Sequence, residues 1–215
     1  MVNQGGTTGN LAEVTTNKSA LVSIQQRGNA FSVSAITATI NAALAANSSI
    51  FAMRFDVGAG TKKARIERIR IAYTTIVAYT VPITAGRRLA VYRGSSANAT
   101  GGTAIATVAK KHSSSPDSEF ESAQGGDVRI ATTGALTVTG ITFETNEFAT
   151  MPLTHLGAAG NFFEEVFEFN ANESAPIVLE PGQLLAIRNP QAMDAAGTWQ
   201  VVVRIDWYEE DSITL

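Results

Sequence analysis

The residues of this sequence that could do chemistry are few, and the two histidines come first. His112 lies in a Ser- and Lys-rich stretch, and His155 lies between Thr154 and a leucine. A serine hydrolase of the common α/β type places its nucleophile in a Gly-x-Ser-x-Gly turn, and no serine of the chain has that setting. We therefore interpret both histidines as ordinary surface or loop residues.

Two groups of carboxylates are the other candidates. Glu164, Glu165 and Glu168 could supply the acid and base of a glycosidase. Adjacent residues of a strand point to opposite faces, so we interpret this group as a solvated rim. Asp206 with residues 209–211 could attract a divalent cation, but the Asp-x-Asp-x-Asp-Gly spacing of a calcium loop is absent. We interpret the latter group as a charged tail after the final strand.

Composition limits the remaining chemistry. The chain of 215 residues has no cysteine, which excludes disulfides, Cys-based zinc sites and thiol catalysis. Two histidines argue against a multi-histidine metal site. The glycine pairs at 5–6, 101–102 and 125–126 are not followed by the Lys-Ser/Thr of a phosphate-binding loop. We expect no enzyme activity, no metal and no cofactor.

Charge is scarce in this chain. Its 16 basic and 19 acidic residues give a net charge of −3 and make up 16% of the sequence, where about a quarter is typical. Two interpretations remain open: a Thr-rich β-protein with a neutral polar surface, or a surface that largely faces other subunits, because interface cores are depleted in charge. The acidic balance predicts no nucleic-acid partner, since tracking a phosphate backbone requires a basic excess.

The sequence also lacks the signals of a membrane protein. No apolar run approaches the 18 or more residues of a membrane helix, so we expect no membrane partner. Residues 1–10 are polar and rich in Gly and Thr, without the basic start and apolar centre of a secretory signal.

The length favours one domain, or one domain with an arm. We predict a flexible N-terminal arm over residues 1–18 and a single β-sandwich domain over residues 19–215. Leu11 and Val14 are the only apolar anchors of the arm that we expect to dock on a partner. The arm is interpreted either as a frayed terminus or as a segment that becomes ordered only against a neighbouring subunit.

From residue 20 onward the pattern indicates strands. Apolar residues alternate with polar ones over Phe31–Ala35 and again from Phe51 to Val57, which predicts half-buried strands. The alternation changes phase after Ala35, which predicts a β-bulge. Residues 41–46 favour at most a single helical turn. Further strands are predicted at 21–24, 74–80, 88–92, 128–130, 136–138 and 141–143. Residues 162–169 form an aromatic cluster that is interpreted as a strand, with a helix as the alternative because Phe162 and Val166 have i, i+4 spacing.

The most basic stretch covers residues 61–71. Arg68 and Arg70 alternate there with Ile69 and Ile71. A basic strand face is typical of a solvated edge strand that resists aberrant pairing; the alternative is charge pairing with an acidic patch on a neighbouring subunit. The stretch lacks the interleaved exposed aromatics of a single-strand nucleic-acid platform.

The C-terminal third carries the clearest pattern. Pro181 and Gly182 occupy the centre of a predicted turn that joins 177–179 to 184–187. The last predicted strand is central in a sheet, with alternate residues in the core; the aromatic residues at its two ends are interpreted as core rather than as a carbohydrate groove. Its inward residues are Trp199, Val201, Val203, Ile205 and Trp207.

About a dozen predicted strands, no long helix and turns at intervals near ten residues indicate an all-β fold. We predict an antiparallel β-sandwich, jelly-roll-like, with an extended N-terminal arm.

Four segments stand out together, namely residues 42–55, 63–71, 179–188 and 197–209, and they resemble a known family. In order and spacing they are similar to small β-rich virion proteins of tailed bacteriophages. The resemblance covers roughly residues 20 to 210 and rests on packing and turn motifs, so no functional residue can be transferred. It implies a jelly-roll-like body, self-association as a homotrimer, and a place in the phage particle.

The function that this resemblance implies is structural. We expect a capsid decoration or cement protein of the virion, assembled in the host bacterial cytoplasm, that self-associates and binds the major capsid protein. The alternative is a tail, collar or fibre-associated module whose loops at 94–102 and 110–126 contact the host.

Overall fold

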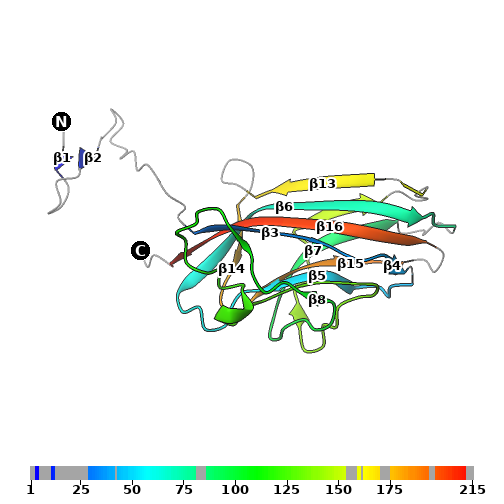
Figure 1. Cartoon of the computed structure of the whole chain (residues 1–215), viewed down its shortest axis with the longest axis horizontal. Helices are drawn as coiled ribbons and strands as arrows, with labels where there is room; N and C mark the ends of the chain where they lie inside the picture. The colour runs from blue at the N-terminus through cyan, green and yellow to red at the C-terminus, as the bar shows by residue number, and fades with distance from the viewer. Residues whose placement is uncertain are drawn as a thin grey trace.

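The chain folds into two antiparallel β-sheets packed face to face (Figure 1). The computed structural model describes residues 3–4, 11–12, 29–41, 43–80, 86–153, 159–160, 162–169, 175–193 and 197–211. These residues contain no α-helix and one 3₁₀ turn, Ser122–Gln124. The all-β prediction is confirmed.

Sheet I follows the order β13-β6-β16-β3-β9, with β14 also on β6 and β4 also on β16. Its strands are β3 (Ala30–Ile36), β4 (Ile40–Asn41), β6 (Lys62–Val77), β9 (Ala109–Lys110), β13 (Phe162–Glu168), β14 (Ile177–Leu179) and β16 (Thr198–Asp211).

Sheet II follows the order β11-β7-β15-β5-β10-β8, with β12 also on β7. Its strands are β5 (Ser48–Arg54), β7 (Arg87–Ser95), β8 (Thr103–Ala104), β10 (Asp127–Ile130), β11 (Thr142–Phe143), β12 (Ala149–Leu153) and β15 (Leu184–Asn189).

Among the described strands, those of five or more residues pair in a nested order. They are, along the chain, β3, β5, β6, β7, β12, β13, β15 and β16. The first pairs with the last, the second with the seventh, the third with the sixth and the fourth with the fifth, all antiparallel. Pairing of β16 with β6 and of β15 with β7 then joins these four ribbons into the two sheets.

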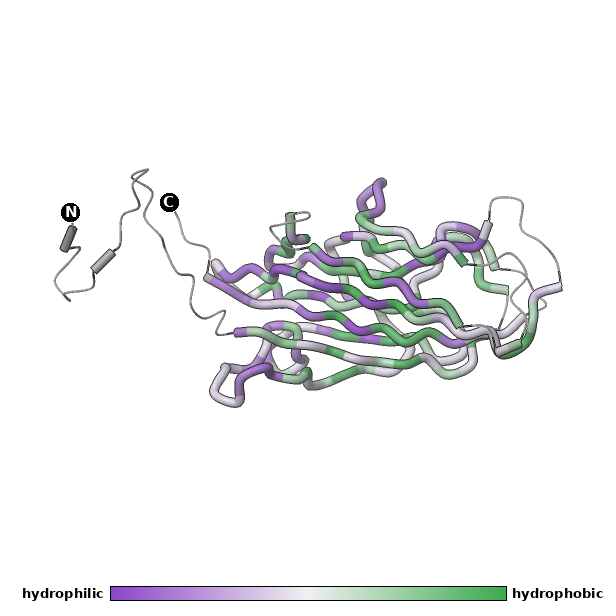
Figure 2. The backbone as a smooth tube through the Cα atoms, turned by 90° about the horizontal axis from the view of Figure 1, so that it is seen from above, coloured by the Kyte–Doolittle hydropathy of each residue, from purple (hydrophilic) through white to green (hydrophobic). Residues whose placement is uncertain are grey.

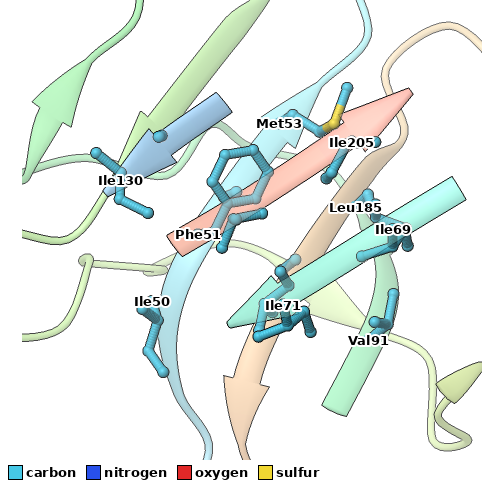
Figure 3. Packing of buried hydrophobic residues seen from close by; sticks show 14 of the residues in the cluster. Ile50, Phe51, Met53, Ile69, Ile71, Val91, Ile130, Leu185 and Ile205 are labelled. Atoms are coloured by element: carbon cyan, nitrogen blue, oxygen red, sulfur yellow. The ribbon is translucent and has the colours of Figure 1, made fainter. Parts of the chain in front are cut away.

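The core lies between the sheets. Hydrophobic and hydrophilic residues alternate along the long strands (Figure 2), and the hydrophobic ones of both sheets meet inside (Figure 3). The predicted inward residues of the last strand are all buried, and β16 lies centrally between β6 and β3, so both predictions are confirmed. Trp207 stacks on Phe31 at 5.8 Å between ring centroids, and Trp199 stacks on Tyr73 at 5.4 Å.

The predicted bulge after Ala35 is present. Ile36 pairs with Val202 and Ile40 pairs with Trp199, so three residues of the β3–β4 segment face two of β16. Thr37 connects the bulge to β16 through two hydrogen bonds of 3.0 Å. Its N–H donates to the carbonyl of Val201, and its Oγ1 accepts a hydrogen bond from the N–H of Val201. The helical turn considered for residues 41–46 is absent from the described part of that segment.

The 180–183 turn forms, with the N–H of Gln183 donating to the carbonyl of Glu180 at 2.9 Å and Gly182 at a φ of 81°. Its two arms do not form a hairpin, however. β14 pairs with β6 of sheet I, whereas β15 pairs with β5 and β7 of sheet II. The turn therefore connects the two layers, because each arm finds its partners in a different sheet.

β5 differs from its predicted half-buried state. Ile50 and Ala52 are buried as well as Phe51 and Met53, so both faces of the strand are covered, whereas Val57 is exposed beyond the strand. Ala90 and Tyr92 of β7 and residues 184–187 of β15 are buried as well, so the outer face of sheet II is covered over the neighbouring strands β7, β15 and β5.

Part of the sequence prediction lies outside the described residues. Leu11 belongs to β2 (Leu11–Ala12), which pairs with β1 (Asn3–Gln4), but its side chain is not described. Val14 and the strand expected at 21–24 are outside the described ranges, so the docking role of the arm stays a prediction. No helix in the described ranges is long and apolar enough to span a bilayer.

Candidate interaction face

The outer face of sheet I is the surface that we consider as the candidate site. Strand register places three rows of side chains on it across β13, β6, β16 and β3. We call these twelve residues the open face. The rows are Glu168–Arg68–Asp206–Ser32, Val166–Arg70–Arg204–Ser34 and Glu164–Ala72–Val202–Ile36.

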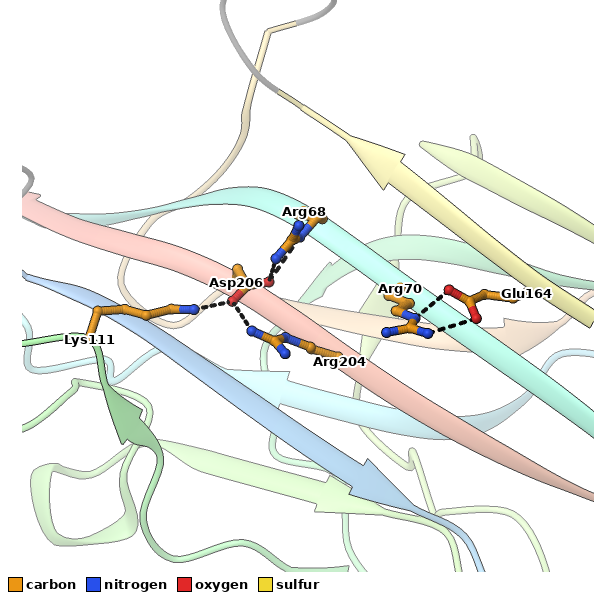
Figure 4. Close-up of polar contacts among 6 residues, drawn as sticks. All are labelled: Arg68, Arg70, Lys111, Glu164, Arg204 and Asp206. Carbon is orange, nitrogen blue, oxygen red and sulfur yellow. Dashed lines mark hydrogen bonds and ion pairs between the residues drawn. The ribbon is translucent and has the colours of Figure 1, made fainter.

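One end of the open face is organised around the carboxylate of Asp206 (Figure 4). Its Oδ2 accepts the Nε and Nη2 hydrogens of Arg68 at 3.0 and 2.9 Å. Its Oδ1 accepts a hydrogen bond from Nζ of Lys111 at 2.6 Å and another from Nη2 of Arg204 at 3.3 Å. One buried carboxylate therefore holds together three cations, from β6, from β16 and from the segment after β9.

The ionisation of Asp206 follows from these contacts. Partial burial opposes the charged form, but the hydrogen bonds from Lys111, Arg68 and Arg204 outweigh it and lower the pKa of Asp206 to about 2. Asp206 is therefore a permanent anion near neutral pH. An open hollow of about 280 Å³ lies beside it, lined also by Glu67 and Glu168.

A second ion pair ties the edge strand β13 to the sheet. Nε of Arg70 lies 2.5 Å from Oε1 of Glu164, and Nη2 lies 2.7 Å from Oε2, which is the two-pronged geometry of a strong arginine–carboxylate pair. The hydrogen bond and the charge of Glu164 raise the pKa of Arg70. Because the pair is exposed, solvent screens it, and its main effect is to orient both side chains.

The other end of the open face is apolar and uncovered. Ile36 is 59% exposed, Val202 37% and Val166 43%, and Phe162, which borders this end of the open face on β13, is 58% exposed. A hollow of about 270 Å³ lies beside Phe162 and Val202, and its lining also includes the small residue Ala72 with Ser34, Arg70 and Arg204. This combination of exposed apolar side chains and flanking arginines is suited to contact with another protein surface.

The solvated-edge interpretation of the basic stretch is wrong. β6 is an interior strand between β13 and β16, and its cations pair with acids of the same chain. The sequence could not reveal this, because the partners lie 57 to 145 residues away. The pairs are Lys62–Glu119, Lys63–Glu180, Arg65–Glu210, Arg68–Asp206 and Arg70–Glu164.

The charged-tail interpretation of residues 209–211 is also wrong. β16 continues to Asp211, with residues 210 and 211 opposite Lys63 and Lys62 of β6, and Glu209 is buried beneath Ser118 and Glu119. Glu209 accepts hydrogen bonds from Oγ of Ser118 at 2.5 Å, Nε1 of Trp207 at 3.1 Å and the N–H of Glu119 at 3.1 Å. Burial raises the pKa of Glu209 despite these bonds.

The other candidate residues are separated in space. Register places Glu164 opposite Ala72 and Glu165 opposite Ile71, hence on opposite faces of sheet I, as predicted. His112 is exposed, and His155 lies outside the described residues. Among the residues that the structure describes, no three His, Asp or Glu side chains lie together as metal ligands. Burial of Trp199 and Trp207 excludes a carbohydrate groove built on these two rings.

Sequence reasoning missed the Asp206 cluster and the Arg70–Glu164 pair. A signal existed: Arg204 and Asp206 share one parity of the last strand, opposite to its core residues, and so do Arg68 and Arg70 of β6. What was missing was the knowledge that these strands are neighbours.

In comparisons of this chain with known proteins, no family model matches and no curated protein is significantly similar.

Proposed function

We propose that this protein is a non-enzymatic structural component of a tailed-bacteriophage virion, a decoration or cement protein that self-associates as a homotrimer and binds the major capsid protein. The observation that carries the proposal is the open face of sheet I. Exposed apolar residues and fixed charges lie together there, while the outer face of sheet II is largely shielded. Uncovered apolar surface rimmed by polar groups is typical of protein–protein contact sites.

The nested strand pairing supports a jelly roll as the finer description of the fold. Pairing of first with last and second with seventh strand corresponds to one long antiparallel ribbon folded over into two sheets of four. Jelly rolls of eight strands are common in viral capsid and lectin domains. The topology is therefore compatible with a capsid role, although fold by itself does not specify function.

The chemistry of the open face supports binding rather than catalysis. Glu164 and Asp206 are already neutralised by arginines and a lysine of the same chain. A general acid or base needs a pKa near the working pH, whereas the pKa of Asp206 is lowered to about 2. Such residues act as fixed charges that orient a partner.

The test is to locate the chain in the particle that contains it. Cryo-electron microscopy is expected to show density for the sandwich on the head shell, and particles without the protein are expected to lose resistance to heat. Density confined to the tail, with none on the head, would reject the decoration role.

A tail, collar or fibre module is the second candidate. Residues 100–102 and 111–114, within the two loops at 94–102 and 110–126, are exposed, which favours contact with a host surface molecule. Binding of the purified protein to a glycan array, abolished by shortening these loops, would favour this candidate over capsid decoration.

A further inference from the structure

Two arginines on neighbouring strands of the open face differ in how well they are neutralised (Figure 4). Arg70 of β6 is directly opposite Arg204 of β16 in the strand register, and like charges in such positions repel each other. Glu164 neutralises Arg70 through the two-pronged ion pair. For Arg204 the acceptor is Oδ1 of Asp206 at 3.3 Å, and the same oxygen holds Lys111 at 2.6 Å. Arg204 therefore has no carboxylate of its own among the residues that the structure describes.

The guanidinium of Arg204 still has hydrogen-bond donors to offer. An arginine carries several N–H donors in a planar fork, and within the described ranges Asp206 alone accepts a hydrogen bond from Arg204. Its Nε is buried without an acceptor there, while 40% of the side chain stays exposed. A charged donor that is partly removed from water and left without an acceptor is unfavourable. Arg204 thus favours the approach of an anion.

An apolar hollow adjoins this charge. Phe162 and Val202 line the hollow of about 270 Å³, and both side chains are partly exposed. Ala72 also lines it, and its small side chain leaves the space open. The lining includes two arginines and no acid. Ser34, opposite Arg204 on β3, adds a hydroxyl that can donate a hydrogen bond to an anion.

These features together select a small carboxylate with an apolar substituent. A planar carboxylate accepts parallel hydrogen bonds from a guanidinium, and the substituent matches the wall of Phe162 and Val202. The volume of about 270 Å³ is just below the range of about 300–1,000 Å³ for drug-sized ligands, so the ligand is small. A phosphate group would bring a further oxygen and more charge against the apolar wall, where they have no partner.

We propose that Arg204, Ser34 and the hollow beside Phe162 and Val202 form a binding site for a small apolar carboxylate. Arg204 holds the carboxylate, and the hollow holds the apolar group. This site goes beyond the proposed structural function and does not depend on it, because every residue of the site belongs to one copy of the chain.

The test is a nuclear magnetic resonance titration of the full-length, ¹⁵N-labelled protein with 4-methylpentanoate. Amide signals of residues 34–36, 72–74 and 202–204 are expected to shift in a saturable way. The neutral isostere 4-methylpentanamide should not shift them, and inorganic phosphate should bind more weakly than the carboxylate. No saturable shift in these three segments overturns the site. An equal response to the amide overturns the role of Arg204, and tighter binding of phosphate overturns the choice of a carboxylate.

Two variants separate the charge from the hollow. Arg204→Gln removes the guanidinium and leaves the Arg70–Glu164 pair in place, so the dissociation constant for 4-methylpentanoate should rise about tenfold or more. Ala72→Val narrows the hollow and keeps both arginines, so it should weaken 4-methylpentanoate more than acetate, a selectivity that a general folding defect would not produce.

Arg129→Gln is the matched control, because Arg129 pairs with Asp127 on β10 of sheet II, away from the hollow. Its affinity for 4-methylpentanoate should equal that of the unaltered protein. If Arg204→Gln binds as tightly as Arg129→Gln, or if Ala72→Val weakens both acids equally, the proposed site is overturned. The proposed structural function stands in either case, because it is tested in the particle and not by this ligand.

Discussion

At the scale of single residues, Asp206 is the group on which the charged end of the open face depends. Asp206→Asn keeps the size of the side chain but leaves Arg68, Lys111 and Arg204 without their shared anion. Hydrogen bonds to charged groups contribute about 1.5–3 kcal/mol, and we expect a loss of that order in the free energy of unfolding at pH 7. Urea denaturation measures it.

The pH dependence of this loss has a definite sign. The pKa of Asp206 is about 2 in the folded protein, below the ordinary value of 3.8. Its stabilising contribution is therefore complete above about pH 4 and is lost as the pH falls toward 2. The difference between the unaltered protein and Asp206→Asn should shrink from pH 6 to pH 2.5. Asp117→Asn, at an exposed pair with Lys110, is the control. If the difference in stability between the unaltered protein and Asp206→Asn were equal at both pH values, the lowered pKa of Asp206 would be contradicted.

The same residue shows what the sequence could and could not predict. Trp199, Val203 and Trp207 were placed in the core because alternation within one strand is a local property. The pairing of Asp206 with Arg68 depends on two strands 138 residues apart becoming neighbours. Glu209 was misread for the same reason: an acid near the end of a strand is predicted as solvated unless the covering segment, here residues 118–119, is known.

At the scale of elements, the bulge between β3 and β4 depends on one hydroxyl. Thr37→Val keeps the shape of the buried side chain but removes the acceptor of the Val201 N–H. A buried donor left without a partner costs about 1–3 kcal/mol, so this variant should unfold at lower urea concentration. Thr37→Ser retains the acceptor and should lose less. Equal loss in the two variants would show that the hydroxyl has no such role.

The close packing within the segment from Ser118 to Gly126 depends on the missing side chain of Gly126. A Cβ at Gly126 would lie 2.5 Å from the backbone of Phe120 and closer still to the carbonyl oxygen of Glu119. Phe120 packs on Phe55 and Trp207, so the segment cannot move away freely.

Gly126→Ala should therefore destabilise the protein by about 1–3 kcal/mol through overpacking. Gly134→Ala is the matched control, because nothing lies within 4 Å of its added Cβ, and its effect should stay within about 0.5 kcal/mol. Thermal unfolding followed by circular dichroism compares the two. If Gly126→Ala and Gly134→Ala had equal melting temperatures, the fold would not require a glycine at position 126.

At the scale of the whole molecule, the question is whether the two sheets unfold as one unit. Both tryptophans lie in β16, so tryptophan fluorescence reports on sheet I. Leu185 belongs to sheet II and is buried in the same core as Ile205 of sheet I (Figure 3). The alternation of each strand predicted that a shared core exists, but not which residues of the two sheets meet in it.

Leu185→Ala leaves a cavity in sheet II and should cost about 2–5 kcal/mol. Because the two sheets share this core, the fluorescence of the sheet I tryptophans and the far-ultraviolet dichroism of all strands should shift together to the same lower urea midpoint. Ile205→Ala, on the opposite side of the core, should give the same coincidence. If Leu185→Ala shifted the dichroism transition and left the fluorescence transition in place, the sheets would be independent folding units, and a partner bound to the open face would stabilise sheet I alone.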